Sequence, residues 1–76
     1  LNYKEKRAYE SLPKEIENLE EEIVTLEACL MDPKCYQHEG LSVVSQMLED
    51  KKVLLEAKVE EYFVLEELIE SFEIES

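Results

Sequence analysis

Residues 9–30 read "YESLPKEIENLEEEIVTLEACL", and their spacing predicts the fold. Apolar residues recur at alternating steps of three and four residues, which is typical of a coiled-coil helix. Heptad positions a and d are filled by Tyr9, Leu12, Ile16, Leu19, Ile23, Leu26 and Leu30. The flanking e and g positions are acidic and include Glu15, Glu20, Glu22 and Glu27. A partner helix should therefore offer cations at its own flanking positions.

Pro13 lies inside this heptad pattern. Proline is tolerated in the first turn of a helix but costs about 3 kcal/mol in its interior. We therefore expect the first long helix to cover residues 13–31, with residues 1–12 forming a separate lead segment, a short helix or turn. The heptad continues across the proline, so Tyr9 and Leu12 should still face the same partner.

A hairpin tip is expected at residues 32–40, between Asp32-Pro33 and Gly40. The residue before a proline is pushed out of the α region, and Asp favours turns. A second long helix should then cover residues 41–73, where no Gly or Pro occurs. Its apolar stripe comprises Leu41, Val44, Leu48, Leu55, Val59, Tyr62, Leu65, Ile69 and Phe72, and is widened by Met47, Leu54 and Leu68. So short a connection makes the two helices antiparallel neighbours.

The predicted fold is all-α: a two-helix antiparallel coiled-coil hairpin. Because the second helix is longer than the first, the lead segment should pack on its overhanging end. There Tyr3, Tyr9 and Leu12 should meet the side chains of Tyr62, Phe63, Leu65, Ile69 and Phe72. Lys51, Lys52 and Lys58 should pair with the acidic flank of the first helix, which sets register more than stability.

Composition agrees with long helices and limits the possible functions. Of the 76 residues, 37% are charged, while only one is Gly and two are Pro. The chain carries a net charge of −12, and a field of that sign repels phosphate backbones and anionic lipid. Nucleic-acid contact is therefore expected only at a local basic patch. No membrane span or leader is visible, and the start at Leu1 suggests a segment cut from a larger protein.

The stretch around the tip holds both cysteines, Cys29 and Cys35, and the single histidine, His38. A zinc site would need Asp32 or Glu39 as a fourth ligand, and the second ligand pair of common zinc motifs is missing. We therefore predict no metal site. Since secretory features are absent, reduced thiols in a cytoplasmic protein are favoured over a disulfide. No nucleophile–base arrangement is present, so this segment is expected to be non-catalytic and to bind no cofactor.

The chain resembles the C-terminal domain of ABC-F ATPases, especially the Uup-type branch. The resemblance is carried by Tyr3-Lys4 and Leu12-Pro13 in the opening, by Asp32-Pro33-x-x-Tyr36 at the tip, and by Tyr62-x-x-Leu65-Glu66 near the close. It spans nearly the whole chain, in order. Asn2, Ala8-Tyr9 and Tyr62 depart from the residues usual in the family, but these differences preserve packing.

The resemblance implies a parent ATPase with two ATP-binding cassettes, no membrane domain, and an attached coiled coil. It implies ATP and magnesium in the cassettes and an action on ribosomes or nucleic acid. The resemblance also links the C-terminal domain itself with DNA binding. No Gly-rich phosphate loop occurs in these 76 residues.

Two functions follow as hypotheses. In the first, the hairpin contacts DNA or ribosomal RNA through its cations, with the candidate residues Lys4, Lys6, Arg7, Lys14 and Lys34. In the second, its acidic faces dock on the protein's own ATPase cassettes or on a basic protein, or its exposed stripe near Leu54 and Leu68 forms a dimer. We expect a monomer or a weak dimer that does not associate with membranes.

Overall fold

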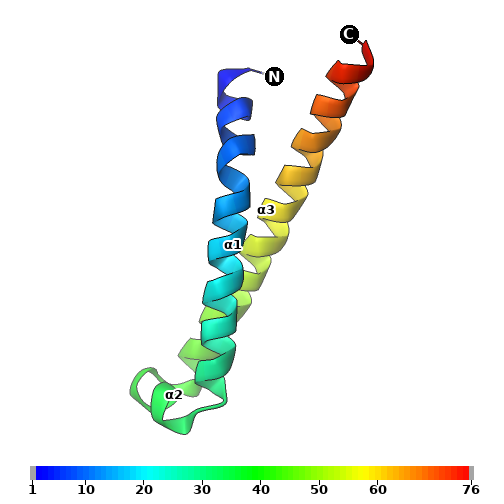
Figure 1. Ribbon diagram of the computed structural model, residues 1–76. Coiled ribbons are helices and arrows are strands. Elements are labelled where there is room, and N and C mark those ends of the chain that lie inside the picture. The colour runs from blue at the N-terminus through cyan, green and yellow to red at the C-terminus, as the bar shows by residue number, and fades with distance from the viewer. Residues whose placement is uncertain (1, 76) are drawn as a thin grey trace.

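The computed structural model describes the backbone of residues 2–75 and the side chains of residues 2–71. The order of elements is α1 (Tyr3–Leu30), α2 (Pro33–Glu39) and α3 (Leu41–Glu75). Helices α1 and α3 run antiparallel, and α2 closes one end of the hairpin (Figure 1). The molecule extends 57 Å along its longest axis and is 16 × 14 Å across. The predicted all-α antiparallel hairpin is confirmed.

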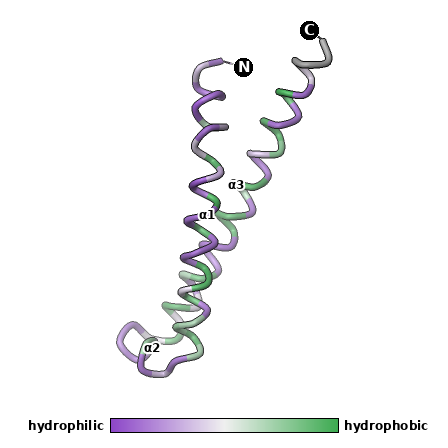
Figure 2. The backbone as a smooth tube through the Cα atoms, in the orientation of Figure 1, coloured by the Kyte–Doolittle hydropathy of each residue, from purple (hydrophilic) through white to green (hydrophobic). Residues whose placement is uncertain are grey.

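The seam between α1 and α3 is the core predicted from the heptads. Its buried side chains are Leu12, Leu19, Ile23, Val44 and Leu65. The other a and d residues of α1 are half-buried. Figure 2 shows hydrophobic and hydrophilic residues alternating turn by turn along both helices, with hydrophilic residues prevailing at the start of α1. Leu41, expected in the stripe, is 54% exposed because it lies at the first position of α3, beyond the seam.

The helix boundary expected at Pro13 is absent, because α1 runs unbroken from Tyr3 through Pro13 to Leu30. Asn2 begins this helix: its side-chain oxygen accepts a hydrogen bond from the Glu5 backbone N–H at 2.8 Å. Contacts on both sides of the proline favour continuity, since Leu12 before it and Leu19 after it are buried in the seam. Packing of the apolar face thus offsets the missing backbone hydrogen bond.

The aromatic cluster forms only in part. Tyr9 and Tyr62 stack with ring centroids 5.0 Å apart and planes 3° from parallel. Tyr3 is 75% exposed and Phe63 57% exposed, so neither enters the seam. Figure 1 shows that α1 and α3 diverge toward the ends that carry the termini, which leaves Tyr3 without a partner helix close by. Phe63 lies on another face of α3, between Tyr62 and Leu65, which both face α1. Phe72, expected in the same cluster, lies outside the described side chains.

The hairpin tip contains a short helix, α2, that was expected to be loop. The Asp32 carboxylate accepts a hydrogen bond from the Lys34 N–H at 3.1 Å, and Pro33 occupies the first turn. Gly40 ends the helix with φ 94°, a conformation that L-residues rarely adopt. Asp-Pro before and Gly after are start and stop signals, so the sequence could have predicted this helix.

Candidate nucleic-acid interface

The first turns of α1 carry the N-terminal cations. Lys4, Lys6, Arg7 and Lys14 are all exposed. Lys4, Arg7 and Lys14 are spaced by three and seven residues and therefore share one face of the helix over about 15 Å. Lys6 lies on a different face. The structure thus brings three of the predicted residues into one stripe, here called the basic stripe.

An aromatic ring accompanies the basic stripe. The Arg7 guanidinium carbon lies 5.8 Å from the centroid of the Tyr3 ring, within the range of a cation–π contact. Tyr3 is largely exposed, so its ring remains accessible from solvent. A guanidinium beside an exposed aromatic ring can contact a phosphate and a base together. Glu10, which is exposed, lies one turn after Arg7 and lowers the local positive charge.

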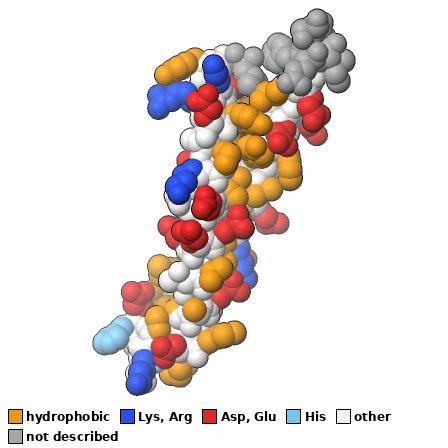
Figure 3. Space-filling view, in the orientation of Figure 1, with side chains coloured by type: hydrophobic (Ala, Val, Ile, Leu, Met, Phe, Trp, Pro, Cys, Tyr) orange, Lys and Arg blue, Asp and Glu red, His pale blue; other side chains and the backbone are white. Residues whose placement is uncertain are grey.

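Lys34 lies at the opposite end of the molecule, in α2. Its side chain and those of Gln37 and His38 are exposed, whereas Tyr36 is half-buried against the hairpin. Because α1 is 28 residues long, about 42 Å separate this tip from the start of the helix. Figure 3 shows cations at both ends, and between them a body that carries many acidic side chains and a few more cations. Lys34 and the basic stripe are therefore two separate candidate contacts.

Cys29 and Cys35 form a disulfide, contrary to the expectation of reduced thiols. The bond links the last turn of α1 to α2, because the reversal of the chain at Asp32-Pro33 brings their Cα atoms to 5.2 Å. The bridge closes a short loop and holds the tip against α1. The spacing alone did not reveal it, since the helical turn after Pro33 determines where Cys35 lies.

The acidic body is crossed by two ion pairs. Lys51 Nζ lies 2.9 Å from a Glu22 carboxylate oxygen, and Lys58 Nζ lies 3.7 Å from a Glu15 oxygen. Two of the three lysines thus pair as predicted. Among the side chains described, no ion pair to Lys52 occurs, and Lys52 is exposed. Because the ammonium groups of Lys51 and Lys58 already bind carboxylates of α1, these two lysines are poor candidates for binding phosphate.

The contact between Tyr9 and Tyr62 also raises the pKa of the Tyr62 hydroxyl. The Tyr62 hydroxyl donates to the Tyr9 hydroxyl at 3.5 Å. This hydrogen bond, with desolvation and the nearby Glu66 carboxylate, raises the pKa of Tyr62 to about 12. Tyr62 therefore stays neutral at physiological pH, and the stacked rings serve packing rather than proton transfer.

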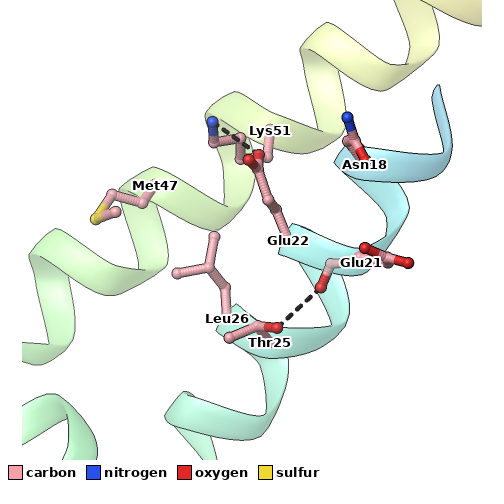
Figure 4. A pocket seen from close by; sticks show the side chains of 7 residues that line it. All are labelled: Asn18, Glu21, Glu22, Thr25, Leu26, Met47 and Lys51. Carbon is pink, nitrogen blue, oxygen red and sulfur yellow. Dashed lines mark hydrogen bonds and ion pairs between the residues drawn. The ribbon is translucent and has the colours of Figure 1, made fainter. Parts of the chain in front are cut away.

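A shallow groove follows one side of the hairpin (Figure 4). It is lined by Asn18, Glu21, Glu22, Thr25 and Leu26 of α1 and by Met47 and Lys51 of α3. An adjoining hollow continues it along the same side to Leu54 and Lys58. The Thr25 hydroxyl donates to the Glu21 backbone carbonyl at 3.0 Å, so it bonds to α1 itself, whereas the Glu22 carboxylate bonds to Lys51 across the groove.

The side chains that the structure describes form no cluster suited to binding a metal ion. No group of three or more His, Cys, Asp or Glu side chains among them is arranged to hold one. Neither long helix, over its described residues, is apolar enough for the length needed to span a bilayer. The features left for function are the basic stripe, the tip and the groove, all of which are suited to binding.

Comparison with known proteins identifies a family to which the chain is similar. A family model described as the ABC transporter C-terminal domain matches residues 1–67. No curated protein and no solved structure matches the chain. The family model covers the basic stripe, the tip and most of α3.

Proposed function

Because the chain belongs to the family of ABC transporter C-terminal domains, the coiled-coil extension of ABC-F type proteins, we propose that it is a non-catalytic accessory module. In this proposal the module positions a parent ATPase on a target that contains DNA or ribosomal RNA. The parent would be a cytoplasmic enzyme that binds ATP and magnesium in its own cassettes. The hairpin itself would contribute contacts rather than chemistry.

The observation that carries the proposal is the basic stripe. Lys4, Arg7 and Lys14 lie exposed on one face of the first half of α1, and the Arg7 guanidinium lies beside the exposed Tyr3 ring. Because Lys4 and Arg7 lie in the first turns of α1, a phosphate backbone bound there stays away from most of the acidic side chains of the hairpin. Lys6 and Lys34 are secondary contacts in this proposal, on another face and at the far tip.

A salt titration tests the proposal. Fluorescently labelled 20-base-pair DNA and RNA duplexes are titrated with the 76-residue chain at 50 and 200 mM salt. We expect binding that weakens with salt and a Lys4→Ala/Arg7→Ala/Lys14→Ala variant with a slope smaller by about 0.9 for each lost DNA phosphate contact. Lys52→Ala, an exposed lysine outside the stripe, is the control and should leave the slope unchanged.

Two results would oppose this function. Absence of binding at 50 mM salt would reject nucleic-acid contact by this chain. Binding unchanged in the triple variant would reject the basic stripe, and a Lys34→Ala variant then reports whether the tip makes the contact instead.

A second candidate function is protein binding. The observation that favours it is the acidic body, with a net charge of −12 for the whole chain and an exposed groove along one side. In this candidate the hairpin docks on the cassettes of its parent or on another basic protein.

A further inference from the structure

One side of α3 carries an apolar stripe that the hairpin does not cover. Along it run two series of residues spaced by seven, Met47-Leu54-Glu61-Leu68 and Val43-Asp50-Ala57-Val64. Residues seven apart lie on one face of a helix, and the two series are neighbours because they are offset by three and four. The five large apolar side chains among them are 38–51% exposed. This stripe resembles the half-formed seam of a second coiled-coil contact.

Two of the α1 side chains beside this stripe are short. Asn18 and Thr25, seven residues apart, are the short side chains that line the groove there (Figure 4). Met47 and Leu26 supply apolar surface on the two sides. Short residues on one wall and apolar residues on the other let a third helix approach both helices. The groove therefore has the shape that a helix would occupy.

The charges around the groove indicate what kind of helix could bind there. The ammonium groups of Lys51 and Lys58 are already bound to carboxylates of α1. Glu21 lines the groove, and Asp50 and Glu61 interrupt the apolar stripe, so the side chains left to meet an occupant are acidic. A second copy of this chain would bring another net charge of −12 against these groups. Lysines or arginines on the flanks of the occupant would complement them.

We propose that this groove docks an amphipathic basic helix of a partner protein. The apolar face of that helix packs on Met47, Leu54 and Leu68, and its flanking cations meet Glu21, Asp50 and Glu61. Met47 and Leu68 are 21 residues apart, so a partner helix of about 20 residues spans the stripe. The inference rests on the second candidate function and adds to it the surface and the chemistry of the partner.

The test uses two synthetic 21-residue helical peptides as probes. Both have leucine at heptad positions a and d; one has lysine and the other glutamate at the remaining charged positions. Binding to the 76-residue chain is followed by fluorescence anisotropy at 150 mM salt. We expect the lysine peptide to bind and the glutamate peptide to fail. A Met47→Gln/Leu54→Gln variant should bind the lysine peptide at least tenfold more weakly.

The matched control is Val53→Gln/Phe63→Gln, which replaces two exposed apolar residues of α3 outside the stripe. Its affinity should change less than twofold, and circular dichroism should show equal helix content in all variants. Equal binding to both double variants overturns the groove but leaves acidic-surface docking standing. Failure of the lysine peptide to bind overturns both. A dimer in sedimentation that Met47→Gln/Leu54→Gln abolishes would assign the groove to a second copy and so overturn a basic partner.

Discussion

Lys51 on α3 holds its ammonium nitrogen 2.9 Å from a carboxylate oxygen of Glu22 on α1. One heptad away the relationship repeats between Lys58 and Glu15. The two lysines are seven residues apart on α3, and their partners are seven apart in the opposite direction on α1, so both pairs report one antiparallel register. Both lysines continue the core spacing of α3 and are half-buried, with their aliphatic stems on the seam and their charges at its edge.

Charge reversal tests this register. Lys51→Glu places two carboxylates together, and we expect the free energy of unfolding to fall by about 1 kcal/mol. Glu22→Lys/Lys51→Glu restores the pair with its charges exchanged and should recover most of the loss. Lys52→Glu changes the net charge equally at an exposed position and should have a smaller effect. Urea denaturation measures all four proteins. A double variant no more stable than Lys51→Glu would contradict the observed register.

Removal of the proline inside α1 should stabilise the hairpin. Pro13 lacks the N–H that would bond to the Tyr9 carbonyl, although the helix continues through it. We expect Pro13→Ala to raise the free energy of unfolding by about 1–3 kcal/mol in urea denaturation. Lys14→Ala, at the neighbouring exposed position, should stay within about 0.5 kcal/mol of the parent. Lower stability in Pro13→Ala would mean that the ring itself contributes packing.

Substitution of Gly40 tests whether the connection between α2 and α3 requires a residue that tolerates positive φ. Its φ of 94° disfavours L-residues, and no atom lies within 4 Å of a Cβ added there. Gly40→Ala should therefore destabilise the chain through backbone strain alone, by about 1–2 kcal/mol in thermal or urea unfolding. D-alanine at the same position, introduced by chemical synthesis, favours positive φ and should be neutral or stabilising. Equal losses for both enantiomers would point to packing instead of strain.

The Tyr9–Tyr62 stack predicts a dependence on alkaline pH. The folded state raises the pKa of Tyr62 from 10.0 to about 12, so folding favours the protonated phenol. The resulting contribution to stability is complete below pH 10 and is lost as the pH rises from 10 toward 12. Absorbance at 295 nm should show a tyrosine that ionises near pH 12, and Tyr62→Phe should remove it.

A second variant identifies the cause of this shift. Tyr9→Phe removes the hydroxyl that accepts from Tyr62 while it keeps the ring, so the pKa of Tyr62 should fall toward 10. If the late ionisation persists in Tyr9→Phe, desolvation and Glu66 would be its main source instead of the hydrogen bond.

The heptad spacing of residues 9–30 determined the hairpin, because alternating steps of three and four leave one apolar face that a second helix must cover. The same spacing placed Leu12, Leu19 and Ile23 in the core, and the charge pattern predicted that Lys51 and Lys58 would face α1. Exposure of the five candidate cations also followed from the sequence, since each lies on a polar stretch. These features depend on local periodicity, which the sequence contains in full.

Only the tertiary structure determined the features that depend on how α1, α2 and α3 pack on one another. Divergence of the two helices leaves Tyr3 exposed beside Arg7. Packing on both sides of Pro13 carries α1 through a residue that breaks isolated helices. The turn of α2 sets Cys35 against Cys29, and the packing of α1 on α3 forms the groove between Asn18, Thr25 and Met47. None of these follows from spacing along one helix, because each requires the position of a second element in space.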